Sequence, residues 1–226
     1  MNPYRIALYY APGTDDTLHQ RASAWLGRDA VSGAVVPQKP VNGVDIAEVT
    51  ADARGYGFHA TLKPPFRVAG DLQAALQAAQ NFAARTAPFA LPPLQITDLD
   101  GFLALRESAP CPALQGLADG AVTALDAHRA PATEAEIARR KPEKLSPRQR
   151  EYLEAWGYPY VFAEWRFHMT LTRRLTPAEK AIILPAVTEA LGDAPAIART
   201  VTDICIFAQA APGAPFIILE RLKLRG

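Results

Sequence analysis

Hydrophobic and polar positions along the chain follow two periodicities. Short apolar runs rich in β-branched and aromatic residues predict strands, and apolar positions three or four residues apart predict helices. The strands are predicted at residues 4–10, 58–63, around 94–96 and 101–105, at about 160–172, and at 201–208 and 215–223. Helices are predicted from Asp15-Asp16 to Gly27, at 71–86 and 114–125, and after the N-terminal caps Thr133, Ser146 and Thr176.

The order of these elements predicts the fold class. Strands and helices are interspersed without an obvious linker, which indicates an α+β fold with antiparallel sheets and flanking helices. Residues 28–57 are rich in Gly, Pro and Asp and predict a loop with one short helix near Ile46.

One short pattern occurs twice. Residues 58–62 read Phe-His-Ala-Thr-Leu and residues 167–171 read Phe-His-Met-Thr-Leu, so four of five positions agree. Side chains alternate between the two faces of a strand. We therefore expect His59, Thr61 and Lys63 to share one face of their strand, and Arg166, His168 and Thr170 to share one face of theirs. Each strand presents an imidazole beside a hydroxyl, and the two strands are expected to meet across a cleft.

These paired motifs resemble those of the 2H phosphoesterase superfamily, which is named for two His-x-Thr/Ser strands. Longer segments resemble one bacterial branch, the phosphonate-metabolism proteins known as domain of unknown function 1045: SAWLGRD (23–29), YGFHATLKPPF (56–66), GFLAL (101–105), HRAP (128–131), EAEIARR (134–140) and WGYPYV (156–161). The resemblance implies a single domain over 1–226, with two pseudo-symmetric lobes around a central cleft and a charged helical insertion at about 112–157. It also implies cyclic phosphodiester or related phosphoester chemistry without a metal or cofactor.

The residue types suit that chemistry. Opening a cyclic phosphodiester requires a base that takes a proton from water and an acid that protonates the leaving alkoxide. Histidine can do either near neutral pH, and threonine hydroxyls can donate hydrogen bonds to the nonbridging oxygens. The candidate catalytic residues are His59, Thr61, His168 and Thr170. Both copies have the same local sequence, so the assignment of base and acid stays open.

Five further residues are candidates for substrate binding: Lys63, Arg166, Tyr56, Arg129 and Arg140. Lys63 and Arg166 flank the two motifs and are expected to contact phosphate, although a solvated strand-end lysine is the alternative. Tyr56 is expected at the mouth of the cleft or in ordinary packing. Arg129 and Arg140 form a predicted second phosphate clamp, whose alternative is a solvated helix end.

Composition narrows the function classes. The chain has 226 residues, with 24 Lys and Arg against 23 Asp and Glu, which disfavours a surface that coats nucleic acid. The near-neutral charge favours a small molecule over nucleic acid, and the family resemblance implies a small cyclic phosphate, with a phosphorylated ribose 1,2-cyclic phosphate of phosphonate metabolism as the expected substrate. A 2′,3′-cyclic nucleotide or RNA-end phosphodiesterase and a non-catalytic protein that binds a phosphorylated ligand are the alternatives.

Histidine and cysteine usage bears on metal binding and location. His19, expected on the surface, and His128 show no metal-ligand motif, so no metal site is predicted. Cys111 and Cys205 lack a CxxC pattern, and no apolar stretch approaches about 20 residues, which predicts a cytoplasmic protein without a membrane segment.

Overall fold

A computed structural model describes residues 3–226. Its main sheet has seven strands: β1 (Arg5–Tyr10), β2 (Ala60–Phe66), β4 (Leu94–Leu99), β5 (Phe102–Glu107), β6 (Met169–Arg174), β8 (Asp203–Gln209) and β9 (Phe216–Lys223). The spatial order is β4-β5-β6-β2-β1-β8-β9, and each neighbouring pair is antiparallel. A separate two-stranded ribbon joins β3 (Phe89–Leu91) and β7 (Arg199–Val201).

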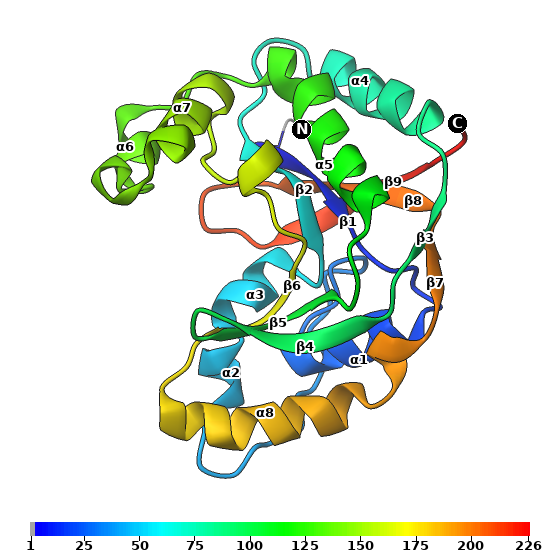
Figure 1. Ribbon diagram of the computed structural model, residues 1–226, viewed down its shortest axis with the longest axis vertical. Helices are drawn as coiled ribbons and strands as arrows, with labels where there is room; N and C mark the ends of the chain where they lie inside the picture. Colours follow the sequence, from blue (N-terminus) through cyan, green and yellow to red (C-terminus); the bar gives the residue numbers. More distant parts are fainter. Residues whose placement is uncertain (1–2) are drawn as a thin grey trace.

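Eight α-helices surround the sheet in the described chain: α1 (Thr17–Leu26), α2 (Ile46–Val49), α3 (Ala51–Tyr56), α4 (Leu72–Ala84), α5 (Pro112–Leu125), α6 (Glu134–Ala138), α7 (Pro147–Trp156) and α8 (Pro177–Leu191). Helices α4 and α5 pack together over β2 and β9, whereas α1 packs on α8 and α3 packs on β6. Helices α6 and α7 project from one side (Figure 1). The predicted α+β class with antiparallel pairing and flanking helices is confirmed.

The two halves of the main sheet are joined by very little strand pairing. Strands β2 and β6 pair at Ala60 and Met169 alone within residues 3–226. One half of the sheet, β4-β5-β6, therefore meets the other half, β2-β1-β8-β9, at a single residue pair. Both histidines of the repeated pattern directly precede this pair in sequence. The division into two pseudo-symmetric lobes stays a prediction.

Local sequence signals set the helix ends as predicted. Thr133 and Thr176 form capping boxes with the glutamates three residues later, and Ser146 forms one with Gln149. Gly27, which ends α1, adopts the left-handed conformation (φ 83°) that glycine reaches without steric cost.

Three predicted boundaries were wrong. Residues 28–57 contain a second short helix, α3, beyond the one near Ile46. The strand predicted at about 160–172 begins only at Met169, because a 3-10 turn occupies Phe162–Glu164. The strand predicted to stop before Pro64 runs from Ala60 to Phe66.

The strand tolerates its two prolines for two reasons. Leu8 pairs with Lys63 and Ile6 with Phe66, so both prolines stand opposite one residue, at a bulge. Beyond Ala60, the other edge of β2 has no strand partner in the described chain. Proline lacks an amide hydrogen and is accepted at bulges and unpaired edges.

A second irregularity in β2 reverses the predicted direction of Lys63. Tyr9 pairs with Thr61 but Leu8 pairs with Lys63, so one extra residue, Leu62, is inserted between the two pairs. Opposite residues share a face, and Lys63 therefore leaves the face of Thr61. Its ammonium is buried, 2.8 Å from Asp126 Oδ1, and does not face the cleft. The expected phosphate contact of Lys63 is thus wrong.

We expect Asp126→Ala to lower the free energy of unfolding by about 3 kcal/mol, because it leaves the buried Lys63 ammonium without its carboxylate partner. Urea unfolding measures this loss. The matched control is Lys63→Met, which removes the charge and leaves Asp126 bonded to Arg129 at 2.9 Å. The Lys63→Met variant should lose less than half as much free energy of unfolding as Asp126→Ala. Equal midpoints for Asp126→Ala and the unsubstituted protein would contradict the role of this ion pair.

Candidate active site

The single β2–β6 pair brings the two His-x-Thr motifs together. Ala60 lies opposite Met169, and continuing this antiparallel register by one residue in each direction brings His59 towards Thr170 and Thr61 towards His168. All four side chains therefore lie on one face of the sheet, as the alternation of each motif predicts. Residues directly opposite each other have Cβ atoms about 5 Å apart, so these groups form one compact cluster.

Both imidazoles are oriented in the same way. His59 Nδ1 lies 2.8 Å from the carbonyl oxygen of Gly57, and His168 Nδ1 lies 2.8 Å from that of Arg166. A carbonyl oxygen only accepts hydrogen bonds, so Nδ1 carries the hydrogen in each ring. Nε2 is then the nitrogen that gains and loses a proton. Each motif thus presents one titrating nitrogen.

The segment before His59 is fixed by a buried arginine. Arg28 donates to three backbone carbonyls, those of Arg54 (2.9 Å), Gly55 (3.2 Å) and Phe216 (2.7 Å). These bonds tie the end of α3 to β9. Gly57 has φ 82°, and a Cβ there would lie 2.4 Å from Ala30 Cβ. Only glycine fits this approach, which sets the carbonyl that orients His59.

His59 lies among aromatic rings. It stacks on Tyr9 with ring centroids 3.8 Å apart, and Nε2 is 3.3 Å from Thr61 Oγ1. The pKa of His59 is lowered to about 4, mainly by burial; the Gly57 carbonyl opposes this effect and the nearby His168, when charged, adds to it. His59 is therefore neutral near pH 7, with a bare Nε2 that accepts the Thr61 hydroxyl.

His168 has different neighbours. Its ring meets the edge of Phe102 at 6.1 Å. Burial is the main cause that lowers its pKa, and Arg106 adds to this effect, whereas the Arg166 carbonyl and Glu107 oppose it. Because Leu105 pairs with Met169, Arg106 lies across from His168.

Arg106 is a site residue that the sequence did not reveal. It bonds Glu107 at 3.2 Å, yet its Nε and Glu107 Oε2 are buried without a hydrogen-bond partner in the described chain. Nothing in the segment GFLALRE marks it, since its closeness to His168 depends on the β5–β6 register.

The candidate binding residues lie in different settings. Tyr56 is 37% exposed and stacks on Phe216 at 5.1 Å. Arg166 is exposed, and its carbonyl orients His168. Arg129 already bonds Asp126 through two nitrogens, at 2.9 and 3.3 Å. The guanidinium of Arg140 lies 4.6 Å above the Tyr158 ring.

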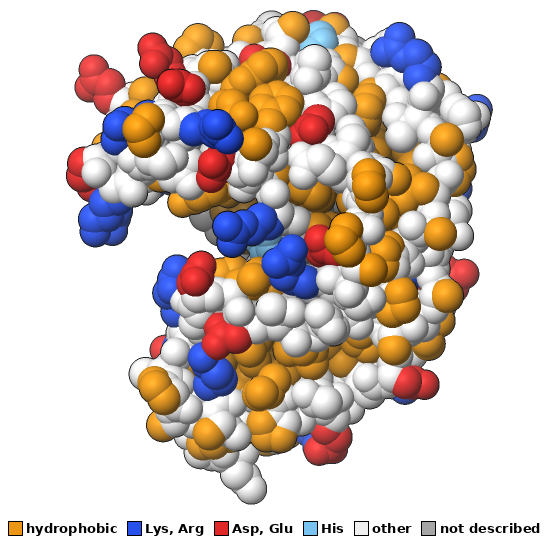
Figure 2. All heavy atoms as spheres, in the orientation of Figure 1, with side chains coloured by type: hydrophobic (Ala, Val, Ile, Leu, Met, Phe, Trp, Pro, Cys, Tyr) orange, Lys and Arg blue, Asp and Glu red, His pale blue; other side chains and the backbone are white. Residues whose placement is uncertain are grey.

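Three of these candidates line one cavity of about 370 Å³: Tyr56, Arg129 and Arg140. The same cavity includes Arg5, Arg67, Arg139 and a single acidic residue, Glu136. Figure 2 shows a notch on one side of the molecule, with Lys and Arg side chains on its rims and a His side chain partly visible between them.

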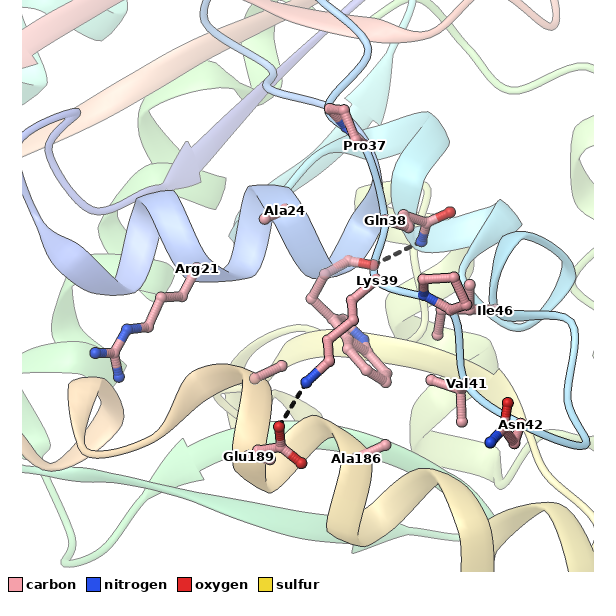
Figure 3. A pocket seen from close by; sticks show the side chains of 13 residues that line it. Arg21, Ala24, Pro37, Gln38, Lys39, Val41, Asn42, Ile46, Ala186 and Glu189 are labelled. Atoms are coloured by element: carbon pink, nitrogen blue, oxygen red, sulfur yellow. Dashed lines mark hydrogen bonds and ion pairs between the residues drawn. The ribbon is translucent and has the colours of Figure 1, made fainter.

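Another cavity, of about 440 Å³, lies between α1, the loop at 37–42 and α8 (Figure 3). There Lys39 points to Glu189 and forms an ion pair of 2.6 Å. Its lining includes none of the candidate site residues.

The position of His19, the possible metal ligands and the helix lengths bear on the remaining sequence predictions. His19 is 5% exposed and bonds Asp29 at 3.2 Å, so its expected surface position was wrong. Residues 3–226 contain no group of three or more His, Cys, Asp or Glu side chains placed to hold a metal ion. No helix over the same residues is long and apolar enough to cross a membrane.

The fold and site define an α+β protein that presents two His-x-Thr pairs side by side on one sheet face. Residues 61–217 match the family described as protein of unknown function (DUF1045), and the chain belongs to this family.

Two curated relatives carry the name ribose 1,5-bisphosphate phosphokinase PhnN. The protein of Janthinobacterium sp. (strain Marseille) is 38% identical over 98% of this chain and 51% of its own length. That of Laribacter hongkongensis (strain HLHK9) is 41% identical over 76% of this chain and 40% of its own length. The chain thus spans about half the length of these relatives or less.

Solved structures similar to this chain include E. coli LigT complexed with 3′-AMP, with a TM-score of 0.49 and 13% identity. LigT complexed with NADP+ has a TM-score of 0.47 and 15% identity. A phosphoesterase has a TM-score of 0.47 and 14% identity. Each alignment covers 100% of both chains.

The desolvated His59 makes stability depend on pH. Its folded pKa of about 4 lies below the ordinary 6.5, so the unfolded chain binds more protons between these values, and stability falls as pH falls through this window. From pH 6.5 to 4.5 the loss from this group is on the order of 2 kcal/mol. We expect His59→Gln to lose correspondingly less over the same range in urea unfolding. Identical losses in both proteins would show that His59 is well solvated.

Proposed function

We propose that this protein is a 2H-type phosphoesterase that opens a small cyclic phosphodiester with two histidines as acid and base. One observation carries the proposal. Two imidazoles with fixed Nδ1 hydrogens and Nε2 atoms that can gain and lose a proton stand at the start of adjacent strands, beside two threonine hydroxyls. Because these imidazoles supply both proton transfers, the reaction needs neither a metal ion nor an organic cofactor.

The environments of the two rings favour His59 as the base. A base must be neutral at rest, and burial against Tyr9 keeps His59 neutral. His59 Nε2 takes a proton from water while the water oxygen bonds to phosphorus. The bond from phosphorus to one ring oxygen breaks, and protonated His168 donates its Nε2 proton to that oxygen. The products are a phosphomonoester and a free hydroxyl, and exchange with solvent resets both rings.

The threonines act on the phosphate in this scheme. Thr61 and Thr170 share the sheet face of the imidazoles. Their hydroxyls donate to the nonbridging oxygens, on which negative charge is held in the transition state. Substrate binding therefore redirects the Thr61 hydroxyl, which bonds His59 Nε2 at 3.3 Å without ligand.

A phosphorylated ribose 1,2-cyclic phosphate, in phosphonate metabolism, is the substrate that we propose. The curated relatives are named for a ribose bisphosphate, which supports a small phosphorylated sugar. A cavity lined by five arginines and one glutamate adjoins Tyr56, which supports a substrate with more than one phosphate.

We expect His59→Gln and His168→Gln each to lower kcat at least a hundredfold, since one positioned proton transfer contributes about 10²–10⁴. The double variant should lose little more than the worse single variant, because the two residues act as a unit. The assay is turnover of cyclic sugar phosphates, cyclic nucleotides and short RNAs with EDTA present. His128→Gln, outside the cluster, is the control and should keep full activity. Loss of activity on chelation, restored by a divalent ion, would overturn the scheme.

The pH profile of kcat/KM should be bell-shaped with its maximum on the acid side of neutrality. The acid limb reports His59, whose pKa is about 4, and activity falls as pH drops and protonates the base. The alkaline limb reports His168, whose pKa lies below 6.5, and activity falls as pH rises and deprotonates the acid. The kcat profile should shift to higher pH, because a bound phosphate anion favours both charged rings. A kcat/KM that stays flat from pH 4 to 9 contradicts paired catalysis.

A further inference from the structure

We infer that Arg5, Arg139 and Arg140 form a binding site for a phosphomonoester dianion, the second phosphate of a doubly phosphorylated substrate. The site is the cavity of about 370 Å³ that Tyr56 also lines. The inference rests on the proposed function for the reacting phosphate and names the group that recognises the rest of the substrate.

Two of the five cavity arginines already form ion pairs with carboxylates of the protein. Arg67 bonds both carboxylate oxygens of Glu136, at 3.3 and 3.1 Å, and this contact lowers the pKa of Glu136 to about 2. Arg129 bonds both oxygens of Asp126 and also donates to the Ala155 carbonyl at 3.0 Å. These two side chains form the walls of the cavity. The predicted role of Arg129 in the phosphate clamp is therefore replaced by a structural one.

The other three guanidinium groups have no carboxylate partner among residues 3–226. Arg5 donates Nε to the neutral amide of Gln209 at 2.9 Å and lies 5.5 Å from the Phe216 ring. Arg140 lies over the Tyr158 ring, and Arg139 forms no ion pair with a residue of the described chain. Three cations that converge on one cavity repel each other until an anion binds between them.

The charge and geometry of the cavity fit a phosphomonoester. Such a group carries a charge of about −1.5 to −2 near pH 7 and three acceptor oxygens. Arginine donates two parallel hydrogen bonds to phosphate. Three arginines without a carboxylate partner in residues 3–226 thus exceed the charge of a dianion by about one and supply donors for all three acceptor oxygens, whereas a neutral sugar or base carries no charge for them to bind.

An aromatic wall connects this cavity to His59. The Arg5 guanidinium faces Phe216, Phe216 stacks on Tyr56 at 5.1 Å, and the Tyr56 ring is 6.0 Å from that of His59. A short sugar that lies along Tyr56 therefore joins a phosphate in the arginine cavity to a cyclic phosphate beside His59. The arginine cavity at the end of this wall favours a small substrate with two phosphates over a cyclic nucleotide, which has no second phosphate.

The test compares ribose 1,2-cyclic phosphate with the same molecule phosphorylated at its 5 position. Arg5→Gln, Arg139→Gln and Arg140→Gln should each lower kcat/KM for the phosphorylated substrate tenfold to a hundredfold, where a factor of ten corresponds to about 1.4 kcal/mol. The unphosphorylated substrate should change less than threefold. Arg140→Lys should recover part of the loss. Arg148→Gln, exposed on α7 and outside the cavity, is the control and should leave both substrates unaffected. Equal losses on both substrates would overturn the inference.

A binding measurement separates this inference from the proposed reaction. Calorimetric titration of His59→Gln/His168→Gln with ribose 5-phosphate should show binding that Arg140→Gln weakens at least tenfold. If the unsubstituted protein turns over no cyclic phosphate and this binding persists, the reaction fails and the arginine site stands. If cyclic phosphates are turned over and ribose 5-phosphate does not bind, the arginine site fails and the reaction stands.

Discussion

The pairing of Ala60 with Met169 is the contact on which the site depends. It is the one point in the described chain where β2 meets β6, and both residues are almost fully buried, at 1% and 0% exposure. Because the pair is the only strand pairing in the described chain between two halves of the sheet, it sets the register between the motifs, together with the hydrogen bond of 2.8 Å that Trp165 Nε1 donates to the Thr61 carbonyl. A slip by one residue would turn the side chains of one motif to the opposite face. The geometry of the candidate site and the continuity of the sheet thus have the same origin.

Two irregularities of β2 divide that strand between the candidate site and the packed core. Before Leu62 its side chains follow the alternation that presents His59 and Thr61. The inserted residue then sends Lys63 to the C-terminal end of α5, where Asp126, the residue after the helix, compensates its charge. The same carboxylate holds Arg129, so one acid anchors the core side of β2 and a wall of the arginine cavity. Asp126 therefore connects β2, which carries part of the candidate site, to the arginine cavity beside it.

Sequence patterns predicted what depends on neighbours in sequence. The caps at Thr133 and Thr176, the stop at Gly27 and the fold class need only local spacing, and the structure has them all. The four His-x-Thr residues could be selected because a repeated pentapeptide is visible without a structure. The direction of Lys63, the burial of His19 and the nearness of Arg106 depend on a bulge, a long-range ion pair and strand register. None of these leaves a signal in composition or periodicity.

The two histidines show how distant residues distinguish identical motifs. Each ring has a Phe before it, a Thr two residues after it and a carbonyl at 2.8 Å from Nδ1. Local sequence therefore gives the pair equal chemistry. The difference comes from strands far away in the chain: Tyr9 of β1 covers one ring, whereas Arg106 of β5 lies beside the other. The proposed hydrolytic cycle needs one neutral and one protonated imidazole at the same pH. The sheet order, which places β1 beside one motif and β5 beside the other, supplies the asymmetry that the duplicated sequence lacks.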